Sequence, residues 1–347
     1  MSVLAIAVEV TMILTLVGVS HGTLDSTAQR ARGVGADIVV RPPNSQVMSS
    51  LSSAPISDKM TGLLMSEPHV VLATGTVIQG LTFPDSITGL DYTAFNKMNG
   101  GFTYLAGGDP VNESDMIVDQ YYAKQKHLRV GSVVHLVNHD WVISGIFEGG
   151  KLARICVKLE TLQELQGSPG HLSQIYVKLD DPKQADAVVA LLKDRLPGYP
   201  IYTMEELTSM LSISNVGMLK EFIGVVIGVA VIVGFIVVFM AMYTAVLERT
   251  REIGILKAVG GGWWFVLQLL FRETLLLALM GTFVGILLTY GTQWLMKHLV
   301  PASLVQETVY FWWPIAGGIA IVGALLGAVV PGIKAVKQDV TEALSYE

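Results

Sequence analysis

The sequence predicts a membrane protein with four transmembrane α-helices and a large extracytoplasmic α+β domain between the first and the second helix. Two observations predict this fold class. Apolar residues gather in four long blocks, and each block is long enough to cross a hydrocarbon core of about 30 Å. The chain between the first two blocks, roughly 200 residues long, has instead the mixed composition of a globular domain.

The overall composition supports this division. Hydrophobic residues make up 51% of the 347 residues and charged residues 15%, whereas ordinary soluble domains are about 25% charged. The formal net charge of −6 gives no support for nucleic-acid binding. The one cysteine, Cys156, can form no disulfide within the chain.

Residues 1–20 form the first predicted transmembrane helix. The run is apolar and about as long as one span requires. A secretory signal peptide is the alternative, but the run lacks a basic first region and Glu9 interrupts its apolar core. We therefore expect a helix that is retained in the membrane.

Residues 21–220 form the predicted extracytoplasmic domain with a stalk helix at its end. Strand and helix patterns alternate, and the closing stretch Ile175–Tyr202 has the order strand, helix, strand. Residues 80–112 are rich in Gly, Asn and Asp, which predicts mainly loops. Thr203 and Glu206 have the spacing of a capping box, so we expect a helix that continues without a break into the second span.

The domain contains no pattern of catalytic or metal-binding residues that rises above chance. None of the histidines His69, His127, His135, His139 and His171 has the spacing of a zinc-binding motif. We therefore expect no metal site, no catalytic residues and no cofactor in this chain.

Three further spans follow the external domain, separated by short polar segments. The order is a second span at 221–247, a cytoplasmic segment at 248–273, a third span at 274–296, a short outer loop at 297–308, a fourth span at 309–333 and a cytoplasmic tail at 334–347. Lys and Arg are more frequent in the segment and the tail than in the outer loop, which places both in the cytoplasm and the large domain outside.

Small residues recur at short spacing in the third and fourth spans. Such residues let the backbones of two helices approach closely. The positions expected to pack helices together are Gly281, Gly285, Ala316, Ala320, Gly323, Ala324, Gly327 and Ala328.

The cytoplasmic segment begins with a dense run of charged residues, in which apolar residues are interspersed. A short helix here would carry a charged collar and a small apolar face at the membrane surface. One interpretation is a basic loop that only fixes the topology. The other is a surface helix on which a cytoplasmic partner presses.

The run Glu248–Gly260 has the sequence ERTREIGILKAVG, which resembles the signature segment of the MacB/FtsX-like permeases of ABC transporters. The Glu-Ala-Leu near the C-terminus resembles the ending of the same family, and the resemblance is weakest in residues 43–100. It implies that the run is the coupling helix that docks on an ATPase subunit. The residues it implies for ATPase coupling are Glu248, Arg249, Arg251, Glu252, Ile253, Gly254, Leu256 and Lys257.

The chain lacks the loop with which ATPases hold phosphate. That loop contains Gly-Lys followed by Ser or Thr, and no lysine in this chain is followed by either residue. The resemblance implies that two copies of a separate ATPase subunit bind the ATP and Mg, and that the chain forms a homodimer among membrane lipids. A periplasmic adaptor or membrane-fusion protein is a further partner to consider.

The function implied by the resemblance is the permease subunit of an ATP-driven exporter that works by mechanotransmission. It would move a hydrophobic or amphipathic compound outward, such as an antibiotic, haem, lipid or lipoprotein. The alternative is a signalling complex that transports nothing and activates an external partner such as a cell-wall hydrolase. The large external domain favours the exporter.

Glu9 allows two interpretations. A charged residue inside a span is costly and usually faces a bundle interior or a cavity. Met12 lies three residues further on, so the two side chains share one helical face and would form a polar or metal-binding substrate site at a dimer seam, for example towards a haem iron. Alternatively, Glu9 lies near the cytoplasmic end and reaches water.

Overall fold

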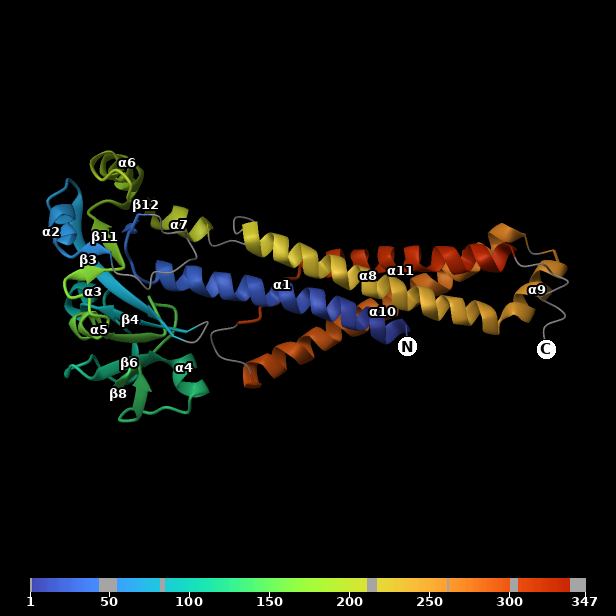
Figure 1. Ribbon diagram of the computed structural model, residues 1–347, viewed down its shortest axis with the longest axis horizontal. Helices are drawn as coiled ribbons and strands as arrows, with labels where there is room; N and C mark the ends of the chain where they lie inside the picture. The colour runs from blue at the N-terminus through green and yellow to red at the C-terminus, as the bar shows by residue number, and fades with distance from the viewer. Residues whose placement is uncertain are drawn as a thin grey trace. The chain divides into compact units, whose positions relative to one another are not determined.

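The computed structural model describes residues 2–43, 55–81, 85–210, 217–260, 262–299 and 305–337. It divides into two compact units (Figure 1). The membrane unit comprises Met1–Gly22, Gly217–Val300 and Gln306–Glu347, and the external unit comprises Thr23–Val216 with Pro301–Val305.

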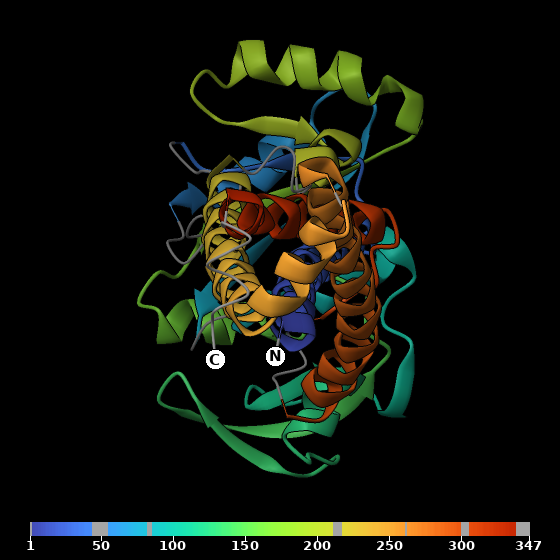
Figure 2. The same ribbon diagram turned by 90° about the vertical axis from the view of Figure 1, so that its right-hand side faces the viewer.

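The described residues of the membrane unit contain four helices that are long and apolar enough to span a membrane. They are α1 (Ser2–Arg32), α8 (Gly217–Glu248), α10 (Trp263–Leu299) and α11 (Trp312–Lys337), and the short α9 (Thr250–Ala258) joins α8 to α10. Seen along the helices in Figure 2, α1 lies between α8 and α10, and α11 packs on both. The predicted four spans are confirmed.

Two helices extend beyond the ends expected from the sequence. Helix α1 continues past residue 20 to Arg32. Helix α10 begins at Trp263, so residues 263–273 belong to the third spanning helix and not to a separate interfacial segment. Arg272 and Glu273 mark a change in polarity but are good helix formers, so they do not interrupt the helix.

The described residues of the external unit form a mixed sheet of ten strands, in agreement with the predicted α+β class. These strands are β1 (Ile38–Val40), β3 (Val70–Gly80), β4 (Ser86–Leu90), β5 (Tyr104–Gly107), β6 (Asp115–Asp119), β7 (Val133–Leu136), β8 (His139–Phe147), β9 (Ile155–Lys158), β11 (Gln174–Leu179) and β12 (Ile201–Thr203). Their order is β12-β1-β11-β3-β4-β9-β6-β8-β5, with β7 paired to β8, while β2 (Ile56–Ser57) and β10 (His171–Leu172) form a second, two-stranded sheet.

Short helices accompany the sheet: α2 (Lys59–Met65), α3 (Tyr92–Asn99), α4 (Gln120–Gln125), α5 (Leu159–Leu165), α6 (Ala185–Arg195) and α7 (Met204–Met210). The predicted strand–helix–strand unit consists of β11, α6 and β12. Both strands run antiparallel to β1, which lies between them, so they are parallel to each other.

The prediction that residues 80–112 are mainly loop is wrong. They contain β4, α3 and β5. The polar and glycine residues that suggested loops instead cap α3: the Asp91 carboxylate accepts hydrogen bonds from the amides of Thr93 and Ala94, and Gly100 ends the helix at φ +77°. Phe102 then packs its ring 4.8 Å from that of Phe95 within the core.

The capping residue Thr203 starts a helix as predicted. Its Oγ1 accepts a hydrogen bond from the Glu206 amide at 3.0 Å, and α7 follows. Whether this helix continues into α8 is a prediction that falls on residues 211–216, which lie outside the described residues.

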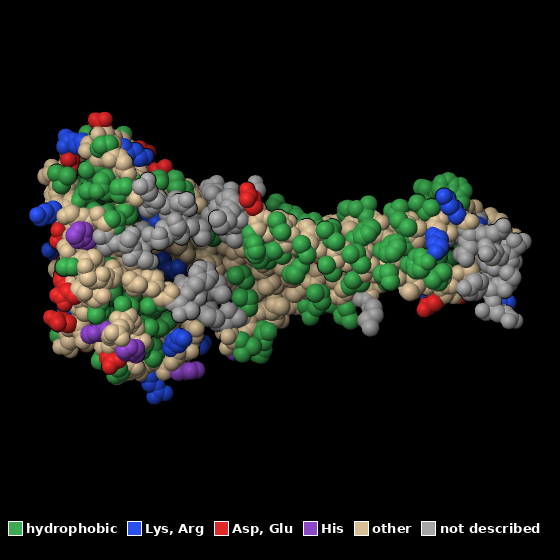
Figure 3. Space-filling model, in the orientation of Figure 1, with side chains coloured by type: hydrophobic (Ala, Val, Ile, Leu, Met, Phe, Trp, Pro, Cys, Tyr) green, Lys and Arg blue, Asp and Glu red, His purple; other side chains and the backbone are tan. Residues whose placement is uncertain are grey.

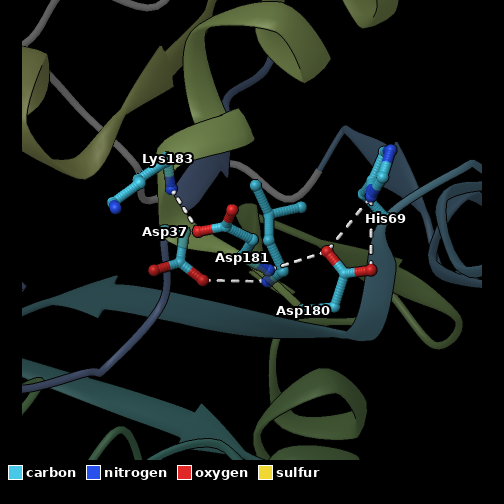
Figure 4. Close-up of polar contacts among 6 residues, drawn as sticks. Asp37, His69, Asp180, Asp181 and Lys183 are labelled. Carbon is cyan, nitrogen blue, oxygen red and sulfur yellow. Dashed lines mark hydrogen bonds and ion pairs between the residues drawn. The ribbon is translucent and has the colours of Figure 1, made fainter.

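Polar contacts hold the end of β11 against β1 and β3 (Figure 4). The Asp37 carboxylate accepts a hydrogen bond from the Leu179 amide at 2.8 Å. His69 Nδ1 lies 3.2 Å from both Asp180 carboxylate oxygens, and the amide of Asp181 donates to one of them. About half of the His69 side chain is exposed, so this histidine belongs to a surface polar contact.

The end of α1 is joined closely to the external sheet. The Leu152 amide donates to the Arg30 carbonyl at 3.0 Å, and the Asn99 side chain donates to the Gly33 carbonyl at 2.8 Å. A Cβ on Gly33 would run into the carbonyl of Gly150. Only glycine therefore allows this close approach between α1 and the loop before β9.

We expect Gly33→Ala to destabilise the external unit by about 1–3 kcal/mol, because the clash is with backbone that cannot rotate away. Gly62→Ala is the control: Gly62 is in α2 with nothing near its missing Cβ, and alanine there should stabilise by about 0.5–1 kcal/mol. Urea unfolding of the two variants gives the comparison. Equal stability of both variants would show that the contact between Gly33 and the Gly150 carbonyl is not tightly packed.

Candidate functional site

Helix α9 begins where α8 turns sharply. Helix α8 ends at Glu248, and Arg249 adopts a non-helical conformation with φ −102° and ψ 17°. The Thr250 hydroxyl then donates to the carbonyls of Val246 and Leu247, at 3.1 and 2.9 Å. Because the last carbonyls of a helix have no partner within it, this threonine stabilises the turn between the two helices.

One face of α9 packs inward. Thr250 and Gly254 are buried, and Ile253 and Leu256 pack against the apolar core of the membrane unit. After Ala258 the chain leaves the helix through Gly260 at φ +101°, a backbone conformation that favours glycine. The inward face therefore fixes α9 on the end of the helix bundle.

The opposite face of α9 is open to solvent. Arg251, Glu252, Ile255 and Val259 are all exposed, and their spacing places them on one side of the helix. Ile255 is 49% and Val259 86% exposed. On the side shown in Figure 3, hydrophobic side chains cover the middle of the membrane unit and charged ones gather near the α9 end.

An ion pair and a small cavity lie behind α9. The Arg249 guanidinium donates to both oxygens of Glu273 on α10, at 3.2 and 3.3 Å. The cavity has a volume of about 140 Å³. It is lined by Ala245, Val246, Arg249, Glu252, Ile253, Leu256, Leu269, Leu270 and Glu273.

The eight residues that the resemblance implied for coupling fall into two groups. Glu248, Arg249, Arg251 and Glu252 are exposed, whereas Ile253, Gly254, Leu256 and Lys257 are buried or half-buried. The prediction missed Ile255 and Val259 as members of the outward face. Their spacing of four and eight residues from Arg251 was a usable signal.

Glu9 lies inside the helix bundle. It is 6% exposed, and its Oε1 has no hydrogen-bond partner among the described residues. Its carboxylate fills the space beside Gly234 of α8, where a Cβ would overlap it. Gly234 lies in the middle of the uncharged stretch Phe222–Leu247, about 18 Å along the helix from Phe222 and about 20 Å from Leu247. The interpretation that Glu9 reaches water near the cytoplasmic end is therefore wrong.

Met12 faces another direction. It is 39% exposed and borders a groove of about 870 Å³ between α1 and α10. The described residues that line the groove are Val8, Thr11, Met12, Thr15, Leu16, Val19, Leu288, Gly291, Thr292, Trp294, Leu295 and Met296. Glu9 does not line it, so the structure does not bring Glu9 and Met12 together on one surface of this chain.

The small residues of the last two spans lie at helix contacts. Ala316, Ala320, Ala324 and Ala328 are at most 2% exposed. Gly281 and Gly285 of α10 face Ile6 and Val10 of α1, Gly323 faces Val231 of α8, and Gly327 faces the Phe235 backbone of α8.

Two family models match the chain. Residues 1–195 match the MacB-like periplasmic core domain, and residues 224–340 match the FtsX-like permease C-terminal domain.

Individual proteins are similar over shorter stretches. An uncharacterized ABC transporter permease, YknZ from Bacillus subtilis, is 31% identical over 48% of this chain and 43% of its own length. A macrolide export ATP-binding/permease protein, MacB from Marinobacter nauticus, is 29% identical over 51% and 28%. The chain thus spans less than half of these relatives. The solved periplasmic region of MacB from Actinobacillus actinomycetemcomitans gives a TM-score of 0.39 at 14% identity, covering 52% of this chain and 94% of that one.

Four spanning helices and an external mixed sheet after the first of them define a multi-pass membrane protein with a large extracytoplasmic domain. The first family model alone covers more than half of the chain. The chain belongs to the MacB/FtsX-like family of ABC transporter permeases.

Proposed function

We propose that the chain is the permease subunit of an ATP-driven exporter and that a separate ATPase subunit docks on the outward face of α9. The exposed face of α9 carries this proposal, because it combines two charged and two apolar side chains on a helix whose other face is fixed to the bundle. A surface of this kind suits a protein partner, since interface cores combine apolar contacts with Arg.

The nucleotide chemistry would belong to that partner. The sequence lacks a phosphate-binding Gly-Lys-Ser/Thr, so ATP and Mg would bind to two ATPase subunits and not to this chain. With only four spans per chain, the natural assembly is a homodimer with one ATPase subunit on each α9. ATP-driven closure of the ATPase pair would then displace both α9 helices.

The displacement would move the spanning helices as levers. Helix α8 leads directly into α9 through the turn at Arg249, so a displacement of α9 would move α8. Helix α1 packs on α8 through Glu9 and continues as one helix to Arg32. Movement of α8 against α1 would therefore act on the external unit, which is the mechanotransmission that the exporter requires.

The cargo in this proposal is a hydrophobic or amphipathic compound such as an antibiotic, haem, lipid or lipoprotein. The groove at Met12 is lined mainly by apolar side chains, with three threonines among them, which suits the hydrophobic part of such a compound. Glu9 supplies a polar group at the depth of the middle of α8, where an ionisable residue is expensive and usually functional. The groove and the Glu9 carboxylate lie on different faces of α1, so the groove would bind the cargo and Glu9 would act on it from inside the helix bundle.

We expect Glu9→Gln to lower the stimulation of ATP hydrolysis by the cargo, because glutamine keeps the size of the side chain and removes the acid. The complex with its ATPase, in nanodiscs, would be tested with a panel of haem, macrolides, peptides and lipids. We expect one class to raise hydrolysis in the wild type about tenfold more than in the variant, the size of a contact to a charged group.

Glu221→Gln is the matched control, because Glu221 is an exposed acid near the N-terminal end of α8. It should leave the stimulation unchanged. Full stimulation in Glu9→Gln would remove Glu9 from the cargo site and leave the exporter intact. Failure of every compound to stimulate the wild type would contradict the exporter itself.

A further inference from the structure

The last turns of α11 form a short arm. Pro331 lies within α11, and residues 332–337, the α11 arm, follow it. A proline inside a helix removes one backbone hydrogen bond and favours bending at that point. The arm can therefore change direction without moving the whole of α11.

Lys257 of α9 holds this arm. Its ammonium group donates to the backbone carbonyl of Val336 at 2.8 Å, in a half-buried contact. A hydrogen bond from an ionised donor to a carbonyl oxygen is stronger than one between neutral groups. The ammonium group of Lys257 therefore links α9 to the α11 arm.

The arm also contacts α8 and α10. Lys334 donates to the Tyr243 hydroxyl of α8 at 2.6 Å, with its ammonium 4.4 Å from the ring centre. A Cβ on Gly332 would lie 3.1 Å from Leu267 of α10. The arm thus lies against two spanning helices, and Lys257 joins it to the helix on which the ATPase would press.

We propose that Lys257 is a positioning residue that couples α9 to the α11 arm, so that one push on α9 moves α11 as well as α8. The inference rests on the proposed docking of the ATPase on α9. Helix α8 is joined to α9 by the chain itself, and α11 packs on α8; the Lys257–Val336 contact adds a direct link from α9 to the α11 arm. Loss of the ammonium group would weaken the coupling of ATP hydrolysis to the movement of the arm.

The test places a spin label at Ile333→Cys in the complete complex with its ATPase, in nanodiscs. Ile333 is in the arm and 45% exposed, and the native Cys156 is fully buried, so the label goes to the chosen position. The mobility of the label is compared without nucleotide and after trapping with ATP and vanadate. Basal hydrolysis and the amount of cargo moved per ATP are measured on the unlabelled variants.

Trapping should change the label mobility in the wild type and in Lys257→Arg, and change it much less in Lys257→Met. The cargo moved per ATP should fall about tenfold or more in Lys257→Met, the loss expected from one hydrogen bond to a charged group. Lys337→Met is the control, because Lys337 is an exposed lysine of the same arm, and it should behave as the wild type.

A change of label mobility on trapping that is as large in Lys257→Met as in the wild type would overturn the inference. Should Lys257→Met fail to fold, Lys257→Gln, whose shorter neutral side chain does not reach the carbonyl, carries the same expectation. If the ATPase does not bind the wild type, the proposed function fails. If the ATPase binds and the arm moves as much in Lys257→Met as in the wild type, only the inference fails.

Discussion

Replacing Ile255 and Val259 with aspartate is expected to weaken binding of the ATPase subunit about a hundredfold or more. Each side chain is exposed on the outward face of α9, and burying such a side chain in an interface contributes about 1.5 kcal/mol or more. A buried aspartate without a partner adds a further cost. The affinity of the chain in nanodiscs for its purified ATPase measures the effect.

Two comparisons make this result specific. Arg251→Ala and Glu252→Ala should also uncouple hydrolysis from transport without lowering the melting temperature, since both residues are exposed. Lys337→Asp changes an exposed charge on α11, away from this face, and should leave the affinity unchanged. Wild-type affinity in the double aspartate variant would refute docking on the outward face.

Replacing Gly327 with leucine is expected to separate α8 from α11 and to lower the stability of the membrane unit by about 3 kcal/mol, at the upper end for overpacking. A Cβ there would lie 2.9 Å from the Phe235 carbonyl and 3.3 Å from the Phe239 amide. Both are backbone atoms of a straight helix, so the neighbouring helix has to move. Thermal unfolding in detergent or nanodiscs would show a loss of several degrees.

Gly318→Leu provides the control on the same helix. Nothing lies within 4 Å of the missing Cβ of Gly318, so leucine there should be tolerated. Equal melting temperatures for the two variants would contradict close packing at Gly327.

The spanning helices were predictable because the hydrophobic effect acts through composition. Four long apolar blocks leave few alternatives in a bilayer, and the structure places helices on all four. The third helix shows the limit: Arg272 and Glu273 suggested a boundary, but their helix propensity is good and α10 continues through them.

The external unit was predicted less completely. Asp91 and Gly100 suggested loops in the region 80–112 because both residues are common in turns, whereas in the fold they cap the two ends of α3. The distinction depends on Phe95 and Phe102, which meet in the core. Tertiary contacts of this kind are not visible in local sequence patterns.

The candidate site shows the same division. The resemblance selected the segment that forms α9, but it did not separate the inward Ile253 and Leu256 from the outward Ile255, because these apolar residues look alike without knowledge of the bundle. The depth of Glu9 was also unpredictable. It depends on how α1 is positioned along α8 and α10, and local sequence patterns do not show which residues of the three helices meet.

The central claim is that an ATPase docks on α9, and site-specific photo-crosslinking tests it most directly. A photoreactive amino acid at Val259, which is 86% exposed, is compared with one at Val111 of the external unit, which is 79% exposed. Both would be activated in the assembled complex. We predict an adduct with the ATPase from position 259 and none from position 111. No adduct from position 259 in an active complex would contradict the claim.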